Sequence, residues 1–213
     1  MSDSSRGRFI VFEGLDGSGL TDQVESIRDW LRRSGHDLGS VAFTHEPSDG
    51  PVGLLLRLAL QGRLDIDEET IALLFATDRN DHLERFILPR LERGIDVICD
   101  RYYLSFYAYQ TGQGLPLRWL RFLGKAWLPP DLTIVLNTPL EQCLNSISGR
   151  FSQDRYEKPE ILKQNWSQFQ RLIKSFQSKG ERIIVVDGSG TLEKVHERIV
   201  PIVAPMLSEV RKP

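Results

Sequence analysis

The sequence has few of the features that mark secreted, zinc-stabilised or membrane-spanning proteins. It contains two cysteines, Cys99 and Cys143, which stand in or beside apolar runs without the spacing of metal ligands. A disulfide framework and a zinc site are therefore not expected, and a reducing compartment is favoured. No stretch approaches the ~18 to 20 apolar residues of a membrane span, and residues 1–8 lack the apolar core of a signal peptide. We expect a cytoplasmic protein with no membrane partner.

A basic excess is also missing. The net charge is -2, whereas proteins that bind nucleic-acid polymers or anionic membranes usually carry a basic excess or patch. A small charged ligand is the better expectation. The chain has no internal repeat, low-complexity tract or linker, and its 213 residues with 40% hydrophobic content are enough for one full core. We predict a single domain over residues 1–213.

Five short apolar runs alternate with longer amphipathic stretches. The runs cover residues 9–13, 40–44, 96–99, 132–136 and 183–186. Continuous apolar strands, as opposed to alternating ones, indicate burial on both faces. The sequence therefore predicts an α/β fold, in which helices cover both faces of a mostly parallel sheet through right-handed crossovers.

Helix boundaries are marked by their own signals. A helix is predicted over residues 21–34, and another over residues 117–127, before a pair of prolines. Asp65 and Glu68 resemble a capping box that opens a long helical stretch reaching Gly94.

The segment GLDGSGLT, residues 14–21, fits the phosphate-binding pattern G-x-x-x-x-G-K-[ST] except that Leu20 occupies the lysine position. The loop follows an apolar run and enters a helix, as the motif requires. Its backbone N–H groups and the helix N-terminus would bind phosphate oxygens, and the Thr21 hydroxyl would face Mg²⁺. A glycine turn without a ligand is the alternative. The predicted phosphate-binding residues are Gly14, Leu15, Asp16, Gly17, Ser18, Gly19, Leu20 and Thr21.

Asp100 and Arg101 directly follow the third apolar run. Ligands of open α/β sheets bind at the carboxyl ends of the strands, so both side chains should emerge beside the phosphate loop. Asp100 could then hold Mg²⁺ through water, and Arg101 could bind a phosphate with two N–H groups. A surface Asp-Arg pair is the alternative.

Residues 149–158, GRFSQDRYEK, form a polar and basic segment between two helical patterns. It is interpreted either as a solvated loop or as a lid that brings Arg150 and Arg155 over a phosphate when ligand is bound.

With these motifs in place, the chain resembles the thymidylate kinases, which are nucleoside monophosphate kinases of the P-loop fold. The resemblance spans nearly the whole chain and rests on six ordered motifs. They are the phosphate loop with Phe12-Glu13 before it, residues 44–47 (THEP), 73–79 (LLFATDR), 100–102 (DRY) with Ser105 and residues 108–110 (AYQ), 130–136 (PDLTIVL) and 154–157 (DRYE). It implies a three-layer P-loop kinase fold with a five-stranded parallel sheet and a small lid at residues 149–158.

The resemblance also implies roles for individual residues. Phe75 and Arg79, four residues apart on one helix face, would stack on a pyrimidine and donate to its O4, which disfavours cytosine. On residue type alone, core packing is the favoured interpretation of Phe75. By the same resemblance, Arg101 would bind the acceptor phosphate, and Tyr102 would crowd the 2′ position of the sugar. Asp16 would contact the acceptor sugar or phosphate. The base pocket would be lined by Ser105, Tyr109 and Gln110. The aromatic residues near Tyr109 could also serve packing alone.

The implied reaction transfers the γ-phosphoryl group of ATP, as its Mg²⁺ complex, to dTMP. Some members of the family place a basic residue inside the loop, and others supply arginine from the lid. Gly17 and Ser18 are small, so Arg150 and Arg155 are the expected lid arginines, with Asp16 and Arg101 as further catalytic candidates. A homodimer is also implied, through helices near residues 67–94.

Three positions depart from the family pattern. Leu20 removes a cation, His45 stands where bacterial relatives usually carry arginine, and Asn137 replaces an acidic residue. Losing one preorganised donor commonly costs ~10² to 10³ in rate. Two interpretations therefore stay open: a dTMP kinase, or a nucleotide-binding relative with little activity that acts through a partner or as a sensor. A kinase for another deoxynucleotide is disfavoured by Phe75 and Arg79.

Overall fold

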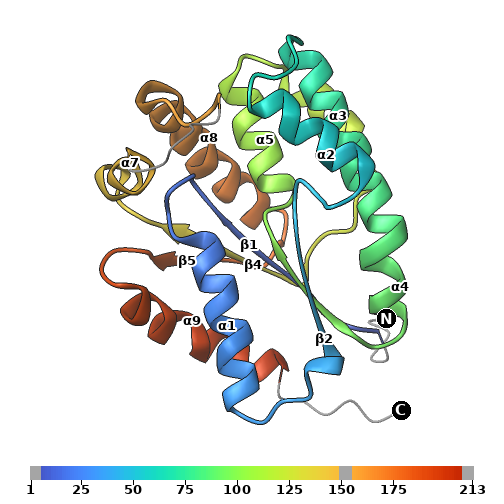
Figure 1. Cartoon of the computed structure of the whole chain (residues 1–213), viewed down its shortest axis with the longest axis vertical. Coiled ribbons are helices and arrows are strands. Elements are labelled where there is room, and N and C mark those ends of the chain that lie inside the picture. Colours follow the sequence, from blue (N-terminus) through green and yellow to red (C-terminus); the bar gives the residue numbers. More distant parts are fainter. Residues whose placement is uncertain (1–5, 149–154, 208–213) are drawn as a thin grey trace.

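A parallel sheet forms the centre of the computed structural model, which describes residues 6–148 and 155–207 (Figure 1). Within these residues the sheet has five strands in the order β2-β3-β1-β4-β5. The strands are β1 (Phe9–Gly14), β2 (Val41–His45), β3 (Asp96–Asp100), β4 (Leu132–Asn137) and β5 (Ile183–Asp187). Each predicted apolar run is a strand, with ends that agree to within one residue. The predicted fold class is confirmed.

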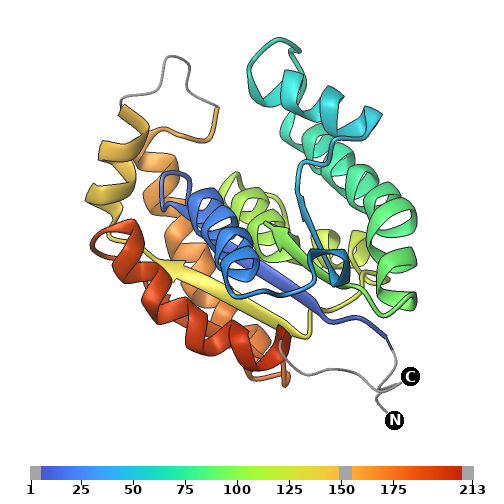
Figure 2. The same cartoon turned by 60° about the horizontal axis from the view of Figure 1, so that its bottom comes forward.

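Helices cover both faces of the sheet (Figure 2). Helices α1 and α9 pack on one face, and the remaining helices lie on the other face or beside it. The helices are α1 (Leu20–Arg33), α2 (Pro51–Leu60), α3 (Glu68–His82), α4 (Leu88–Glu92), α5 (Tyr103–Gly112), α6 (Leu117–Leu123), α7 (Leu140–Ser148), α8 (Pro159–Gln177) and α9 (Leu192–Leu207), with a short 3-10 helix η1 (Leu38–Ser40).

Helix α1 buries one stripe of side chains against the sheet and α9. The stripe consists of Leu20, Val24, Ile27 and Leu31, spaced so that all four lie on one helix face. It packs with apolar residues of β1 and β4, including Phe12. This packing fixes the angle at which the phosphate loop enters the helix.

Helix α5 is the central element of the opposite layer. Nine of its residues are buried, and it packs along α8 and over β1. Cys99 and Cys143 are both buried in this layer as free thiols, which agrees with the expected absence of a disulfide.

Two predicted helix boundaries are wrong. Asp67, not Asp65, caps α3, because its carboxylate accepts the Thr70 N–H at 2.7 Å. The helix predicted over residues 117–127 ends at Leu123, since Gly124 and the turn after it bring Trp127 inward.

The long stretch toward Gly94 is helical but not uniform. A π-helical turn, η2 (Leu83–Ile87), separates α3 from α4, and Pro89 lies in the first turn of α4. Proline removes one N–H donor and crowds the preceding turn, and wider π turns accommodate such interruptions. In the described part of the chain, no helix is both long and apolar enough to cross a membrane.

Candidate functional site

The phosphate loop joins β1 to α1 at the carboxyl edge of the sheet. Gly17 and Gly19 have φ values of 76° and 80°, a left-handed conformation that favours glycine. A Cβ atom at Gly17 would also lie 2.3 Å from the Cys143 carbonyl oxygen. The Thr138 hydroxyl, which follows β4, donates to the Ser18 carbonyl at 3.1 Å. Glycine backbone conformations and a hydrogen bond from Thr138 therefore shape the loop itself.

Leu20 is the first residue of α1 and is 3% exposed. Its side chain begins the buried stripe that continues through Val24 and Ile27. An aliphatic chain here extends the hydrophobic core to the edge of the loop. The sequence motif identifies the departure at this position, and the structure shows where the leucine side chain goes.

Thr21 and Asp100 meet at the start of α1, as their places in the sequence predict. The Thr21 hydroxyl donates to Asp100 Oδ2 at 2.6 Å. Asp100 is 7% exposed, and its other oxygen, Oδ1, is buried without a hydrogen-bond partner in the part of the chain that is described. Buried carboxylate oxygens rarely stay unpaired, so Oδ1 is available to a ligand.

Arg101 connects the phosphate loop to α5. Its Nη2 bonds Asp16 Oδ1 at 2.7 Å, and its Nη1 donates to the Gly14 carbonyl at 2.9 Å. The Tyr109 hydroxyl donates to the second Asp16 oxygen at 2.8 Å. Burial alone lowers the pKa of Arg101, but the charge of Asp16 raises it above the ordinary value. A permanent cation thus lies beside the loop.

A cavity of about 130 Å³ opens next to Arg101. Most of the predicted acceptor residues meet there. Gln110 is fully buried but is not among the lining residues; its amide lies 3.5 Å from the Tyr156 hydroxyl. The lining residues are Asp16, Glu46, Pro47, Leu60, Phe75, Arg79, Arg101, Tyr102, Ser105, Phe106, Tyr109 and Tyr156.

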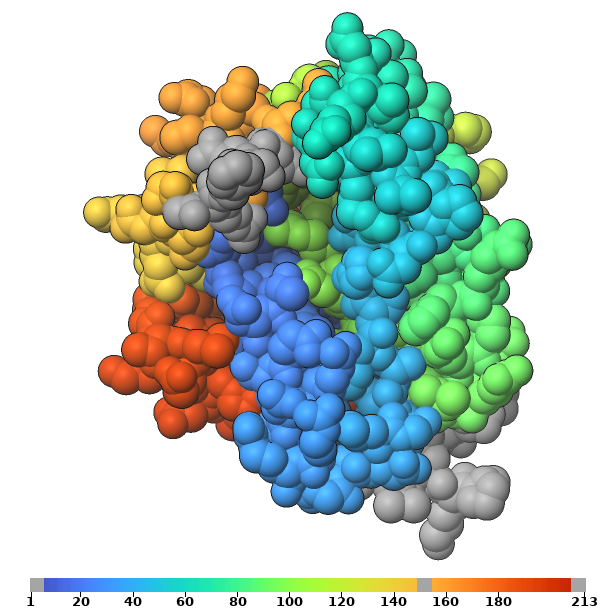
Figure 3. Space-filling model, in the orientation of Figure 1, coloured from blue at the N-terminus to red at the C-terminus, as the bar shows by residue number. Residues whose placement is uncertain are grey.

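A larger groove, of about 900 Å³, continues from this cavity between α1, β2 and α3. Glu46 and Arg101 line both spaces, and Thr21 and Asp100 line the groove. In the space-filling view, a hollow separates the blue surface of α1 from the cyan surface of α2, with green side chains at its floor (Figure 3). Phosphate loop, predicted metal residues and acceptor cavity therefore border one continuous cleft.

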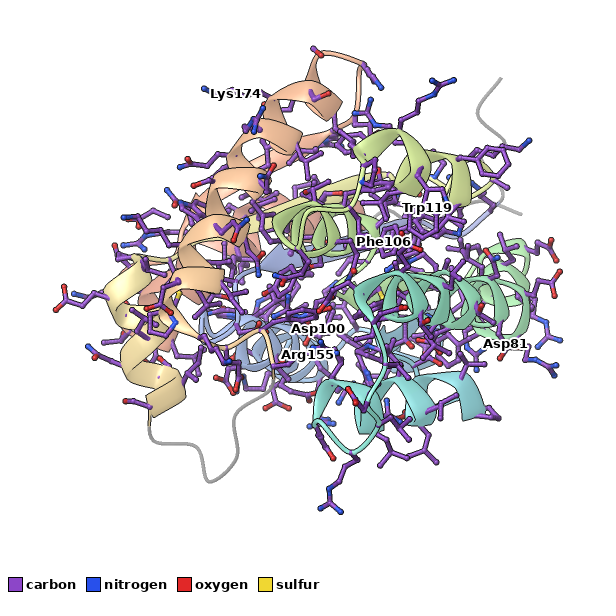
Figure 4. All side chains as sticks on the ribbon, turned by 90° about the horizontal axis from the view of Figure 1, so that it is seen from above. Asp81, Asp100, Phe106, Trp119, Arg155 and Lys174 are labelled. Atoms are coloured by element: carbon purple, nitrogen blue, oxygen red, sulfur yellow. The ribbon has the colours of Figure 1, made fainter. Side chains whose placement is uncertain are left out.

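Arg79 is held deep in the wall of the acceptor cavity. It is 1% exposed, and its Nε donates to Glu46 Oε2 at 2.7 Å. The rings of Tyr102, Phe106 and Trp127 lie within 5.3 Å of its guanidinium carbon. Figure 4 shows Phe106 in the interior of the molecule. The Arg79 Nη1 atom is buried without a partner among the described residues, which leaves a donor for a ligand.

Phe75 lies on the same helix as Arg79 and also lines the cavity. Its ring is only partly buried and meets Phe106 at 6.3 Å between centroids. It therefore combines core packing with a face toward the cavity.

The described end of the predicted lid lies against the start of α3. Arg155 forms an ion pair with Glu68 at 2.8 Å, and the Tyr156 hydroxyl donates to the other Glu68 oxygen at 2.7 Å. Tyr156 lines the acceptor cavity, whereas Arg155 is not among its lining residues. Arg150 and the rest of the predicted lid through residue 154 lie outside the described residues.

Four residues of the site gained no role from the sequence: Glu13, Glu46, Trp127 and Tyr156. Glu13, Glu46 and Tyr156 belong to motifs that carry the family resemblance, so their positions could be flagged but their contacts could not. Trp127 gave no signal, since it was assigned to a helix that ends earlier. Its Nε1 donates to Asn80 at 2.8 Å, which places the ring over Arg79.

Comparisons with known proteins agree with this geometry. The family model described as thymidylate kinase matches residues 12–199. A probable thymidylate kinase of Pyrococcus abyssi is 37% identical over 204 residues, covering 93% of this chain and 96% of the relative. A thymidylate kinase of Schizosaccharomyces pombe is 32% identical over 204 residues, covering 96% and 95% respectively. The chain belongs to the thymidylate kinase family.

Proposed function

We propose that this protein is a thymidylate kinase, which transfers the γ-phosphoryl group of ATP to the 5′-phosphate of dTMP and yields dTDP and ADP. Its role is to supply the dTTP precursor in the cytoplasm, as one domain over residues 1–213. One observation carries the proposal beyond family membership: Arg101 joins the phosphate loop to an acceptor cavity in which a second arginine, the buried Arg79, has a free donor.

The acceptor cavity suits a pyrimidine deoxynucleotide. Arg101 binds the acceptor phosphate after exchanging its bond with Asp16, which then faces the sugar. Phe75 stacks on the base, and Arg79 Nη1 donates to O4. Tyr102 stands at the 2′ side of the sugar, and Ser105 and Tyr109 complete the base pocket. Gln110 does not line the cavity and supports it from behind, through the Tyr156 hydroxyl.

Thr21 and Asp100 fit a magnesium site. Mg²⁺ prefers oxygen ligands and is commonly held by one or two protein groups together with water and substrate phosphates. The hydroxyl–carboxylate pair and the unpartnered Asp100 Oδ1 match that preference. Bound there, Mg²⁺ would neutralise developing phosphate charge.

The lid supplies the cations that the phosphate loop lacks. Arg155 is within the described residues and is bound to Glu68, so transfer requires that it exchange this partner for a phosphate oxygen. Arg150 is the second lid candidate. Phosphoryl transfer depends mainly on positioning and charge stabilisation, which is why a lid arginine can replace a loop lysine in principle.

A nucleotide-binding protein with little kinase activity is the second candidate. It is favoured by Leu20, whose buried side chain places no charge at the transferred phosphate. In that case the cleft binds nucleotides, and the protein acts as a sensor or through a partner.

A coupled assay with dTMP and MgATP separates the two candidates when wild type is run beside Leu20→Lys. For the kinase, we expect turnover in wild type that the lysine does not improve. Turnover confined to Leu20→Lys would instead establish the second candidate. Leu20→Met is the matched control, because it keeps an apolar side chain of similar size in the α1 stripe and adds no charge.

We also propose a homodimer through α2 and α3. Leu54, Leu55 and Leu58 of α2 and Leu73 of α3 are exposed, and these two helices pack together. Exposed apolar patches of this kind mark association sites. Sedimentation equilibrium should return twice the chain mass, and a monomer mass at micromolar concentration would refute the proposal.

A further inference from the structure

Glu13 is a buried carboxylate that the reaction described above does not use. It lies at the carboxyl end of β1, directly before the phosphate loop, and is 0% exposed. Buried carboxylates are rare unless hydrogen bonds compensate them. All of its hydrogen bonds that are described go to one place, the start of α5.

The N-terminus of α5 lacks a cap of its own. Tyr102 occupies the N-cap position and makes no side-chain cap hydrogen bond. Glu13 Oε1 accepts the backbone N–H groups of Tyr102 and Ser105, both at 3.1 Å, and Oε2 accepts the Ser105 hydroxyl. A residue about 90 positions away therefore caps the helix. The negative charge also faces the positive end of the helix dipole.

Arg101 stands immediately before this cap, in a conformation that needs support. Its φ is 71°, and among the described residues it is the one non-glycine residue with positive φ. Such a backbone costs of order 1 kcal/mol and persists only where neighbours determine it. β1 supplies these neighbours on both sides, since Phe12 O accepts the Arg101 N–H at 2.8 Å and Gly14 O accepts its Nη1.

Ser105 links the carboxylate to the guanidinium. Its hydroxyl has one proton, which it donates to Glu13, so its oxygen is free to accept from Arg101 Nη1 at 3.3 Å. Glu13 thereby sets the direction in which the Ser105 hydroxyl points. The Arg101 turn follows Asp100, which Figure 4 labels.

We propose that Glu13 is a positioning residue: it caps α5 from β1 and orients Ser105 so that Arg101 is held ready for the acceptor phosphate. The proposal rests on the function proposed above for Arg101. It explains why the glutamate stands next to the phosphate loop, because the end of β1 then holds in place both that loop and Arg101. Burial raises the pKa of Glu13 to about 7, although hydrogen bonds from Ser105 and the charges of Arg101 and Arg79 lower it. Keeping the carboxylate ionised therefore costs folding free energy.

Glu13→Gln tests the orientation directly. The amide oxygen can still accept both backbone N–H groups, but the NH₂ group then faces Ser105 and donates to its hydroxyl. The Ser105 hydroxyl proton must then turn toward Arg101 Nη1, which is also a donor, so the hydrogen bond between these two groups is lost. We expect dTMP affinity, measured by calorimetry on the full chain without ATP, to fall about tenfold. The KM for MgATP and kcat at saturating dTMP should stay within about twofold.

Two comparisons separate positioning from simple loss of stability. In a Ser105→Ala background the hydroxyl is gone, so Glu13→Gln should have a much smaller additional effect on dTMP affinity. Asp131→Asn is the matched control, because Asp131 accepts the Phe9 N–H at 2.7 Å at the opposite end of β1. It should lower the melting temperature and leave dTMP affinity unchanged.

The outcomes are distinct. Unchanged dTMP affinity in Glu13→Gln, additive effects with Ser105→Ala, or equal losses for dTMP and MgATP would each overturn the positioning role and leave the proposed function intact. Absence of dTMP binding in the folded wild type would overturn the proposed function and, with it, this inference.

Discussion

The acceptor cavity and the phosphate loop meet at Arg101 but are built in different ways. The acceptor side contains two arginines, each bound by a carboxylate: the buried Arg79 by Glu46 and the partly exposed Arg101 by Asp16. The phosphate loop is shaped by glycine conformations and backbone hydrogen bonds, and its lysine position holds the apolar Leu20. A charge removed from the acceptor side leaves a carboxylate without its cation, and the cost is largest at the buried Glu46. A charge removed from the loop leaves the loop intact, so the loop tolerates Leu20 structurally.

Arg101→Ala gives the largest expected effect and tests the acceptor side of this comparison. The variant loses a cation that binds the phosphate and leaves Asp16 to repel it. We expect dTMP affinity to fall about a hundredfold, since hydrogen bonds between charged groups contribute about 1.5 to 3 kcal/mol. Calorimetry with dTMP measures the loss.

The MgATP side should respond little to the same change. Because the loop is formed by backbone groups, we expect the KM for MgATP in Arg101→Ala to change less than about threefold. The double variant Asp16→Asn with Arg101→Ala is the control for the uncompensated carboxylate. An equal loss for both nucleotides would mean that the two sides are one electrostatic unit.

Arg79 tests whether base selection depends on a single buried donor. Arg79→Gln alone would leave the buried Glu46 without its arginine and with only His82 beside it among the described contacts, so the informative variant is Arg79→Gln with Glu46→Gln, compared with Glu46→Gln. We expect dTMP affinity about tenfold below that of the single variant, because one hydrogen bond to O4 is lost. The preference for dTMP over dCMP, measured as a ratio of kcat/KM values, should shrink in the double variant. A preference that survives without Arg79 would assign base selection to other residues.

The sequence predicted the features that depend on local pattern. Five apolar runs located the five strands, and the position of Asp100 after its strand predicted its meeting with Thr21, because parallel strands bring their carboxyl ends to one edge. Contacts set by the packing of distant elements were beyond reach. Glu13 and Ser105 are 92 residues apart, and no local pattern relates them. Trp127 reaches Arg79 because α6 ends at Leu123, before Gly124, whereas the prediction extended the helix past that glycine to the pair of prolines.

Local propensity also misplaced the start of α3 for a physical reason. Asp65 and Glu68 have the spacing of a capping box, but Asp67 makes the cap and Glu68 is bound to Arg155 and Tyr156. Glu68 thus forms an ion pair with Arg155 of the predicted lid, whereas the capping-box rule assigns it to the N-terminus of α3. The residues whose local prediction failed, Glu68 and Trp127, are both in contact with the acceptor side, where tertiary charge arrangements dominate.

The smallest expected effect concerns the cost of keeping Glu13 charged. Its pKa in the folded protein is about 7, above the ordinary glutamate value of 4.5, so the folded state binds the proton more tightly than the unfolded chain. The stability that this group contributes is therefore complete below pH 4.5 and is lost as pH rises through about 7. Glu13→Gln mimics the protonated form and removes this dependence.

We compare the unfolding free energies of Glu13→Gln and wild type, measured by urea denaturation. The difference, variant minus wild type, should rise by on the order of 1 kcal/mol as the pH is raised from about 5.5 to 7. At the higher pH the variant would then be relatively more stable and yet bind dTMP more weakly. These opposite signs distinguish a carboxylate kept for positioning from one kept for the fold, because a purely structural residue would lose both quantities together. A relative stability of Glu13→Gln that is flat or falls with pH would show that the hydrogen bonds from α5 outweigh the cost of burying the charge.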